Sequence, residues 1–379
     1  MNPLLRRAAL GAVLVSVALG ATACGLPPGS PATPDVPVVE SPTPGPVEPA
    51  AASGERPEAR AEAACSDFAN PALLDPLFAR PVAEAPPTRT AEYIGARIAD
   101  AWVIRQDGGF ACEWSNVDAM VTSEGRFGYD GLRLELIAAS GPQWQEFSDA
   151  NGDGSDRLLE CYDYAWSCDL NQYLANGWWL KLTADNMDAG AAPTEAALRT
   201  LATPVFSSIV AAASALPAAD PAWTFPAPDD AFGGGCTGVI TGARLSSALG
   251  LGPAAVSEEH PFPYIGRAAL LDVGGSECSW KESGGFYDIA NIEVLPGGAW
   301  AQADAKAAME ALVGGPVPTP AVAGVPAGAT ALYQHVDSVS LDLVIGGTWI
   351  KISIAGGFET GGMPPEDALL AIGAEIAAG

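Results

Sequence analysis

The sequence has few of the side chains that most often carry acid–base or metal chemistry. Its 379 residues include two histidines, His260 and His335, and neither has a second histidine at metal-ligand spacing. The serine-nucleophile, zinc-protease and phosphate-loop motifs are also absent from the sequence. We therefore expect that the protein is not an enzyme. A cell-envelope hydrolase stays open as an alternative, because the many carboxylates could include an acid–base pair.

Basic residues and long apolar runs are scarce as well. Lys and Arg total 18 against 45 Asp and Glu, and the formal net charge is −27. A polyanion of this size repels nucleic acid and anionic lipid headgroups, so we expect no nucleic-acid partner. Beyond the N-terminal apolar run, no segment reaches the ~18 uninterrupted apolar residues typical of a membrane-spanning helix.

The N-terminus has the pattern of a secretory signal. Arg6 and Arg7 precede an apolar run over residues 8–18, and the small residues Ala21-Thr22-Ala23 stand before Cys24. This order predicts a signal peptide over residues 1–23. The four residues ending in Cys24 resemble the lipobox of bacterial lipoproteins. That resemblance implies a palmitate-type lipid anchor on Cys24 and a place on the extracytoplasmic face of the cell membrane. Plain secretion after cleavage near Ala23 is the alternative.

Residues 24–60 read as a stalk. Ten prolines lie within residues 25–60, among Gly, Ser, Thr, Ala and Glu. A segment of this composition cannot bury a core, and a proline-rich chain favours extended polyproline II. At ~3.1 Å per residue, the predicted disordered stalk spans roughly 100 Å.

The remaining chain reads as a duplication. Five landmarks recur in the same order: Cys65 and Cys236, Tyr93-Ile94-Gly95 and Tyr264-Ile265-Gly266, Cys112-Glu113-Trp114 and Cys278-Ser279-Trp280, Trp144 and Trp300, and Trp179-Leu180-Lys181-Leu182 and Trp349-Ile350-Lys351-Ile352. The period is too long for a solenoid, so we expect two tandem domains. Their predicted bounds are 61–216 and 231–379, with a proline-rich linker over 217–230.

Each copy follows one pattern of elements. Thr241 is a suitable N-cap for a helix over residues 242–249 that Gly250 would end. A Cys-x-Trp strand, an alternating strand, a helix near Trp144 or Trp300 and a hairpin follow. We place two-residue hairpin turns at Asn176-Gly177 and Gly346-Gly347. A closing helix ends each copy, over 193–216 with a kink or split at Pro204, and over 364–378. The fold class is therefore α+β, with an antiparallel sheet packed by helices in each domain.

Six cysteines remain after Cys24, an even number that favours disulfides in a secreted chain. The second copy contains only Cys236 and Cys278, which pair most simply with each other. Their counterparts Cys65 and Cys112 should pair in the same way. Cys161 and Cys168, found only in the first copy, are left to close a short loop.

One loop of the first copy matches a calcium-site spacing. Asp149, Asn151 and Asp153 offer oxygen ligands, Ser155 offers its carbonyl, and Glu160 would complete the shell. With Gly154 at its sharp turn, the loop resembles an EF-hand site, and a helix is expected on either side of it. Asp156 and Arg157 depart from the family pattern. The alternative is an ordinary loop rich in Asp, Asn and Gly.

The repeated Trp-x-Lys is the second candidate site. On a strand, Trp179 and Lys181 share one face, as do Trp349 and Lys351. They predict either a pair of ligand-contacting surfaces or tryptophans packed under a helix beside lysine stems. Trp114 and Trp280 are expected in the core beside their disulfides, and Tyr93 and Tyr264 at a turn or a sheet edge.

A further resemblance concerns the whole arrangement. A cysteine before a T-x-x-x-L-x-x-A-L-G helix (residues 241–250), a second cysteine in C-x-W and a closing helix resemble surface lipoproteins of actinobacteria. The resemblance implies an extracytoplasmic location and the fold, and no catalytic residues. Our leading hypothesis is a membrane-tethered extracytoplasmic binding or interaction module, whose ligand is an unknown protein or small molecule. A solute-binding lipoprotein of a transporter and a structural accessory remain alternatives.

Overall fold

A computed structural model of the chain describes residues 55–85, 97–116, 130–152, 154–220, 232, 235–257, 264–283, 288–334, 338–355, 358 and 360–379. The predicted signal peptide, Cys24, most of the predicted stalk, the landmark Tyr93–Gly95, Asp153 and both histidines lie outside these residues. The two predicted domains belong to one compact unit, Pro49–Gly379.

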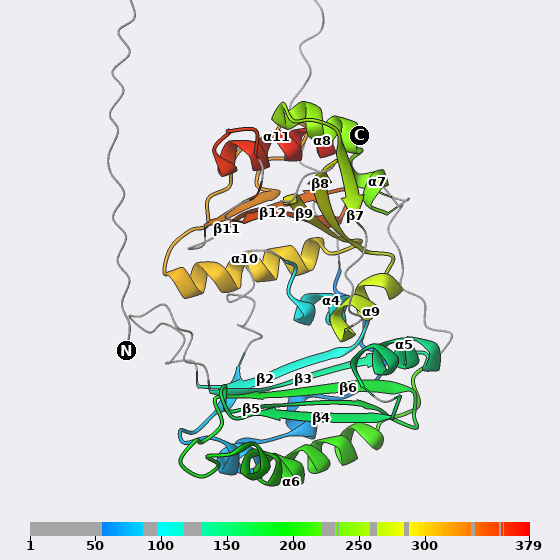
Figure 1. Cartoon of the computed structure of the whole chain (residues 1–379), viewed down its shortest axis with the longest axis vertical. Coiled ribbons are helices and arrows are strands. Elements are labelled where there is room, and N and C mark those ends of the chain that lie inside the picture. The colour runs from blue at the N-terminus through cyan, green and yellow to red at the C-terminus, as the bar shows by residue number, and fades with distance from the viewer. Residues whose placement is uncertain are drawn as a thin grey trace, which may run out of the picture. The chain divides into compact units, whose positions relative to one another are not determined.

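Each predicted domain contains one six-stranded antiparallel sheet, as the fold class required (Figure 1). Sheet A has the order β1-β2-β3-β6-β5-β4 and sheet B the order β10-β11-β12-β9-β8-β7. The strands of sheet A are β1 (Ala83–Ala85), β2 (Phe110–Ser115), β3 (Gly131–Ala138), β4 (Arg157–Tyr162), β5 (Ser167–Tyr173) and β6 (Trp178–Asp185). Those of sheet B are β7 (Ala254–Ser257), β8 (Ser276–Glu282), β9 (Asp288–Leu295), β10 (Thr330–Gln334), β11 (Ser338–Ile345) and β12 (Thr348–Ala355).

The two sheets have the same topology, because β1 to β6 occupy the places that β7 to β12 occupy in sheet B. The likeness extends to single residues. A Cβ added to Gly109 would collide with the carbonyl oxygen of Leu136, and one added to Gly275 would collide with that of Val294. Leu136 and Val294 face Leu180 and Ile350 on equivalent strands. The two domains are therefore similar in topology and in local packing.

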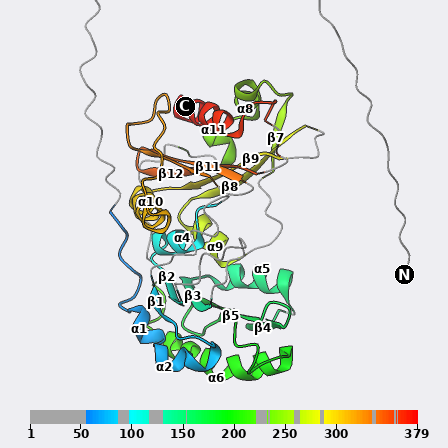
Figure 2. The ribbon, with the colours of Figure 1, turned by 90° about the vertical axis from the view of Figure 1, so that its left-hand side faces the viewer.

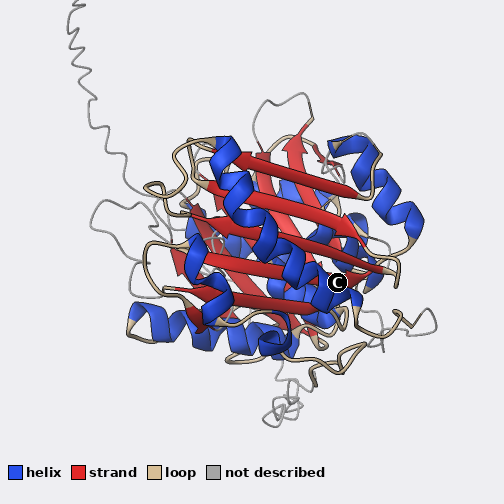
Figure 3. Cartoon of the chain, turned by 90° about the horizontal axis from the view of Figure 1, so that it is seen from below, coloured by secondary structure: helices blue, strands red, loops and turns tan. Residues whose placement is uncertain are grey.

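Helices cover both faces of each sheet (Figures 2 and 3). One face of sheet A is covered by α1 (Cys65–Phe68) and α6 (Glu195–Ser214), with α2 (Pro71–Leu74) and η1 (Asp75–Leu77) beside α6. The other face is covered by α4 (Asp100–Gln106) and α5 (Gly141–Asn151). Sheet B is packed by α7 (Cys236–Val239), α8 (Gly242–Leu249) and α11 (Pro365–Ala377) on one face, and by α9 (Ile265–Asp272) and α10 (Ala299–Val313) on the other.

Local signals explain where several helices begin and end. Helix α8 has the predicted bounds: the Thr241 hydroxyl accepts from the Arg244 N–H, and Gly250 ends the helix at φ 66°. Helix α6 runs without interruption through Pro204, so the predicted split there is wrong. Its apolar face, which includes Leu198, Phe206 and Ile209, is buried on sheet A, and this packing holds both halves of the helix in place.

By length and hydropathy, α6 is also the one helix among the described residues that could cross a membrane. Core helices of soluble proteins pass the same test, and one side of α6 belongs to the core on sheet A.

The hairpins agree with the sequence in one copy and differ in the other. Gly346 and Gly347 form the two-residue turn between β11 and β12, at φ 58° and 86°. In the first copy, β5 ends at Tyr173 and β6 begins at Trp178, so the predicted two-residue turn is wrong. The Asn176 side chain there donates to the carbonyls of Ala213 and Leu216 at the end of α6, which ties the longer loop to that helix.

All three predicted disulfides are formed, Cys65–Cys112, Cys161–Cys168 and Cys236–Cys278. Trp114 and Trp280 are fully buried beside the two long links, as expected. Each domain therefore has a disulfide-linked core of its own on the outer side of its sheet.

Candidate functional site

A third core lies between the two sheets. Helices α4 and α9 pack against each other there, and side chains from both domains join in one apolar cluster. The indole N–H of Trp300, from the second domain, donates to the side-chain oxygen of Gln106, from the first, at 2.5 Å. Gln143 on α5 donates to Asp272 on α9 at 2.7 Å. Each domain thus contributes to the core of the other.

The first Trp-x-Lys pair faces this shared core. Trp179 has no exposed surface, and its ring centroid lies 5.5 Å from that of Trp144 and 4.7 Å from that of Phe147 on α5. The Lys181 ammonium lies 3.3 Å from the Glu135 carboxylate on the neighbouring strand. Trp179 is thus packed under a helix, and Lys181 is held in an ion pair.

The second pair is buried more deeply. The ammonium of Lys351 lies 2.7 Å from the carboxylate of Asp342, and both side chains are almost fully buried. The same ammonium lies 4.7 Å from the ring centroid of Tyr333 and 5.8 Å from that of Trp349. The Lys351 and Asp342 side chains have almost no exposed surface, whereas the Lys181 side chain is 23% exposed. Ligand binding by Trp179, Lys181, Trp349 and Lys351 stays a prediction.

Charged groups bridge the two domains across the shared core. Arg97, just before α4, pairs with Glu277 on β8 at 2.9 Å and donates to the hydroxyl of Tyr264 at 2.7 Å. Tyr264 immediately precedes α9, so its expected place at a turn or sheet edge is wrong. The backbone N–H of Ile98 donates to the carboxylate of Glu293 on β9 at 2.6 Å.

Burial dominates the electrostatics of this region. It raises the pKa of the Glu293 carboxyl well above its usual value, and the nearby Glu277 adds to the effect. It also raises the pKa of Asp100, on α4, to about 6. A pair of buried carboxyls with raised pKa values is a feature of many active sites. Here Glu293 accepts from the Ile98 N–H and lies near Arg97, and Asp100 lies near Lys181 and Arg97, so the arrangement can join two domains.

The described residues of the calcium loop are not flanked by two helices, as an EF-hand site would require. Asp149 and Asn151 are in the last turn of α5, which confirms the predicted entering helix, but the chain leaves the loop as strand β4 and not as a helix. The Asp149 carboxylate accepts from the Gln145 amide at 2.7 Å, and the Ser155 carbonyl accepts from the Ser148 hydroxyl at 2.9 Å.

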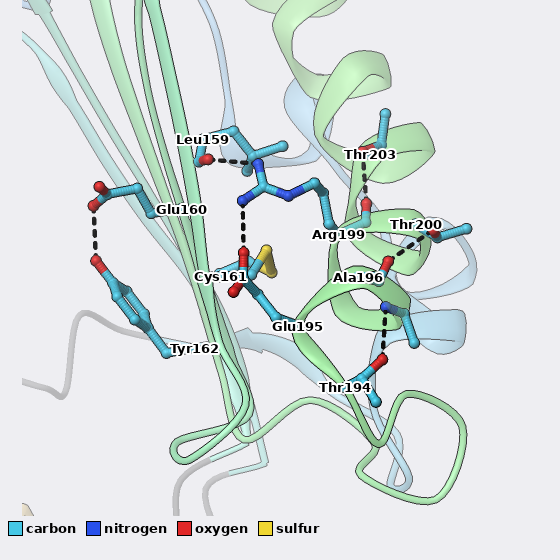
Figure 4. Close-up of a disulfide and its surroundings, with 12 residues drawn as sticks. Leu159, Glu160, Cys161, Tyr162, Thr194, Glu195, Ala196, Arg199, Thr200 and Thr203 are labelled. Atoms are coloured by element: carbon cyan, nitrogen blue, oxygen red, sulfur yellow. Dashed lines mark hydrogen bonds and ion pairs between the residues drawn. A yellow bond between two sulfur atoms is a disulfide. The ribbon is translucent and has the colours of Figure 1, made fainter. Parts of the chain in front are cut away.

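Glu160, on β4, accepts from the hydroxyl of Tyr162 at 2.7 Å (Figure 4). Within the described part of the chain, which leaves out Asp153, no group of three His, Cys, Asp or Glu side chains is placed to hold a metal ion. Calcium binding by this loop stays a prediction.

Among the described residues, the most exposed aromatic side chains lie on the hairpin that the Cys161–Cys168 disulfide closes. Tyr164 is 80% exposed and Trp166 41% exposed, and the Tyr162 ring centroid lies 5.7 Å from that of Tyr164. The carboxylate that Tyr162 meets, Glu160, is also exposed, as is Asp163. The hairpin therefore presents aromatic faces and negative charge to solvent.

The hairpin is held rigidly. Cys161 and Cys168 face each other across β4 and β5, and the disulfide joins them at a Cα–Cα distance of 4.1 Å. Trp166 has φ 45°, a left-handed conformation that is uncommon outside glycine, and its carbonyl accepts from the Met187 N–H at 2.7 Å. Arg199 on α6 donates to the Leu159 carbonyl of β4 at 2.6 Å and pairs with Glu195 (Figure 4).

Sequence reasoning found this disulfide but missed the aromatic surface. The signal that could have found it is the spacing of Tyr162, Tyr164 and Trp166 between two cysteines of a short loop with no counterpart cysteines in the second copy.

Comparisons with known proteins add no identification. No protein-family model matches the chain, and comparison with curated proteins and with solved structures gave no match.

Proposed function

We propose that the protein is a lipid-anchored extracytoplasmic binding module that docks a partner through the disulfide-closed hairpin of its first domain. The observation that supports the docking surface is the exposure of Tyr164 and Trp166 on a rigid hairpin. Tyrosine and tryptophan dominate binding hot spots, because they bury a large area and lose little side-chain entropy.

Two further observations favour the hairpin over other surfaces. A non-glycine residue with positive φ, as at Trp166, is retained where the surrounding structure fixes it, and such strain clusters at functional sites. The second domain has the equivalent strands, β10 and β11, but no cysteines there. The hairpin is thus a specialisation of one copy, as expected for a binding feature added to a duplicated scaffold.

The predicted lipid anchor would determine where the hairpin meets its partner. Cleavage before Cys24 and acylation of that cysteine would hold the module outside the membrane on a proline-rich stalk. Three disulfides agree with an oxidising compartment.

Site-specific photo-crosslinking on living cells tests the docking surface. A benzophenone side chain is placed at position 164 of the full-length protein, and a control is placed at Asp367, an exposed residue of α11. We expect a discrete crosslinked product from position 164 that is lost when Trp166→Ala is added. Equal yields from the two positions, or a product that survives Trp166→Ala, would contradict docking through the hairpin.

A further inference from the structure

A separate apolar groove lies between α2 and α6, on the outer side of sheet A. Its cavity volume is about 670 Å³, and Leu73 and Pro76 line one wall while Thr200, Leu201, Pro204 and Val205 line the other. Volumes between roughly 300 and 1,000 Å³ are typical of small-molecule sites. No residue that lines the groove carries a charge.

The absence of charge is notable in so acidic a chain. From Thr200 to Ala219 the sequence contains no Asp, Glu, Lys or Arg. The nearest charged side chains on α6, Glu195 and Arg199, form an ion pair with each other at 3.1 Å. Transfer of an ionised group into this groove would cost free energy with no opposite charge to compensate, so a charged ligand is disfavoured.

The polar groups of the groove are acceptors. The Thr200 hydroxyl donates its hydrogen to the Ala196 carbonyl at 2.8 Å, as Thr203 does to Arg199 one turn on (Figure 4). Pro204 has no N–H, so the helix cannot supply the usual donor to the carbonyl of Thr200, four residues earlier. The Thr200 carbonyl and hydroxyl oxygens can therefore each accept a hydrogen bond from a ligand.

From this chemistry we infer that the groove binds an uncharged small amphiphile, made of a hydrocarbon chain with one hydrogen-bond donor. The hydrocarbon covers Leu73, Leu201 and Val205, and the donor meets the oxygens of Thr200. This inference depends on neither the hairpin nor the lipid anchor, so each can fail without the other.

Three probes of equal chain length separate the elements of this proposal: 1-decanol, decyl methyl ether and decanoate. The protein is the full-length chain with Cys24→Ser, secreted and purified without detergent, and binding is titrated by ligand-observed NMR. We expect decanol to bind about tenfold more tightly than the ether, the factor that one hydrogen bond supplies. Decanoate should bind more weakly than decanol. Equal affinity for all three probes, or no saturable binding of decanol, would overturn the inference.

Three variants test the place of binding and the role of proline. Ala72→Asp puts a carboxylate at the exposed wall of the groove and should weaken decanol binding at least tenfold, whereas Ala211→Asp, exposed on α6 outside the groove, should not. Pro204→Ala restores an N–H for the Thr200 carbonyl without weakening the helix. This variant should reduce the difference in affinity between decanol and decyl methyl ether. Loss of decanol binding in Ala211→Asp would refute the place of binding. An unchanged difference in affinity between decanol and the ether in Pro204→Ala would refute the role of the Thr200 carbonyl.

Discussion

The backbone N–H of Ile98 in the first domain donates to the carboxylate of Glu293 in the second, and this hydrogen bond is buried between the two sheets. Arg97, next to Ile98, pairs with Glu277 on the strand beside Glu293. Two consecutive residues of one domain are thus bound by two neighbouring carboxylates of the other. This contact, together with the shared apolar cluster, makes the tandem copies one unit, so the stability of each depends on its contact with the other.

The first prediction concerns the pH dependence of this contact. Because burial raises the pKa of Glu293, the folded protein retains a proton that the unfolded chain releases. From the ordinary Glu pKa of 4.5 up to the raised folded pKa, this group makes stability fall as pH rises. Glu293→Gln keeps an acceptor for Ile98 and removes the charge, so it should increase the free energy of unfolding at pH 7.5 by about 1–2 kcal/mol.

Urea unfolding at several pH values measures this effect. We expect the gap between Glu293→Gln and the parent protein to close as the pH is lowered towards 5. Glu62→Gln, at an exposed carboxylate, is the matched control. It should leave the pH dependence of the free energy of unfolding unchanged. A destabilised Glu293→Gln at pH 7.5 would mean that the ionised carboxylate is needed for the contact.

The second prediction uses the structural equivalence of the two copies. An added Cβ at Gly109 would collide with the backbone carbonyl of Leu136, and one at Gly275 with that of Val294 on the equivalent strand. Moving a backbone carbonyl within a sheet costs free energy. Gly109→Ala and Gly275→Ala should each destabilise the protein by about 1–3 kcal/mol, the usual cost of overpacking. Gly315→Ala, where no atom lies within 4 Å of the added Cβ, should be nearly neutral in the same thermal melt. An effect confined to one copy would show that the equivalence does not extend to energetics.

Local sequence signals predicted much of the fold. Caps at Thr241 and Gly250, alternation in β3 and β9, and the repeated cysteines each depend on residues close in sequence or on the duplication. Helix α8, strands β2, β3, β8 and β9 and the three disulfides were therefore found, whereas β4 was expected to be a helix. The contact between the domains was not predictable in this way. Residues far apart in sequence form it, and the Trp-x-Lys face that served as a candidate ligand surface is covered by α5 and by the other domain.

The third prediction concerns the anchor. Cys24→Ser removes the only thiol that the lipobox offers for acylation, so the protein should move from the membrane fraction to the culture medium. Fractionation in a salt wash is the measurement, because a lipid anchor resists salt whereas the contacts of a polyanion do not. An unchanged membrane fraction for Cys24→Ser would show that a different feature retains the protein.

The last prediction concerns calcium at the loop between α5 and β4. The Asp149 and Glu160 carboxylates already accept hydrogen bonds from Gln145 and Tyr162, and the Ser155 carbonyl accepts one from Ser148. An ion would have to displace these donors. A site that needs such rearrangement has low affinity, in the millimolar range of extracellular calcium modules.

We therefore expect calcium at several millimolar, and not at micromolar concentration, to raise Tm by a few degrees, because a ligand that binds only the folded state stabilises it. Glu160→Gln should abolish the shift, and Glu195→Gln, at the ion pair on α6, should preserve it. A melt that neither calcium nor a chelator changes would leave Asp149 and Glu160 with the hydrogen bonds described above as their only role.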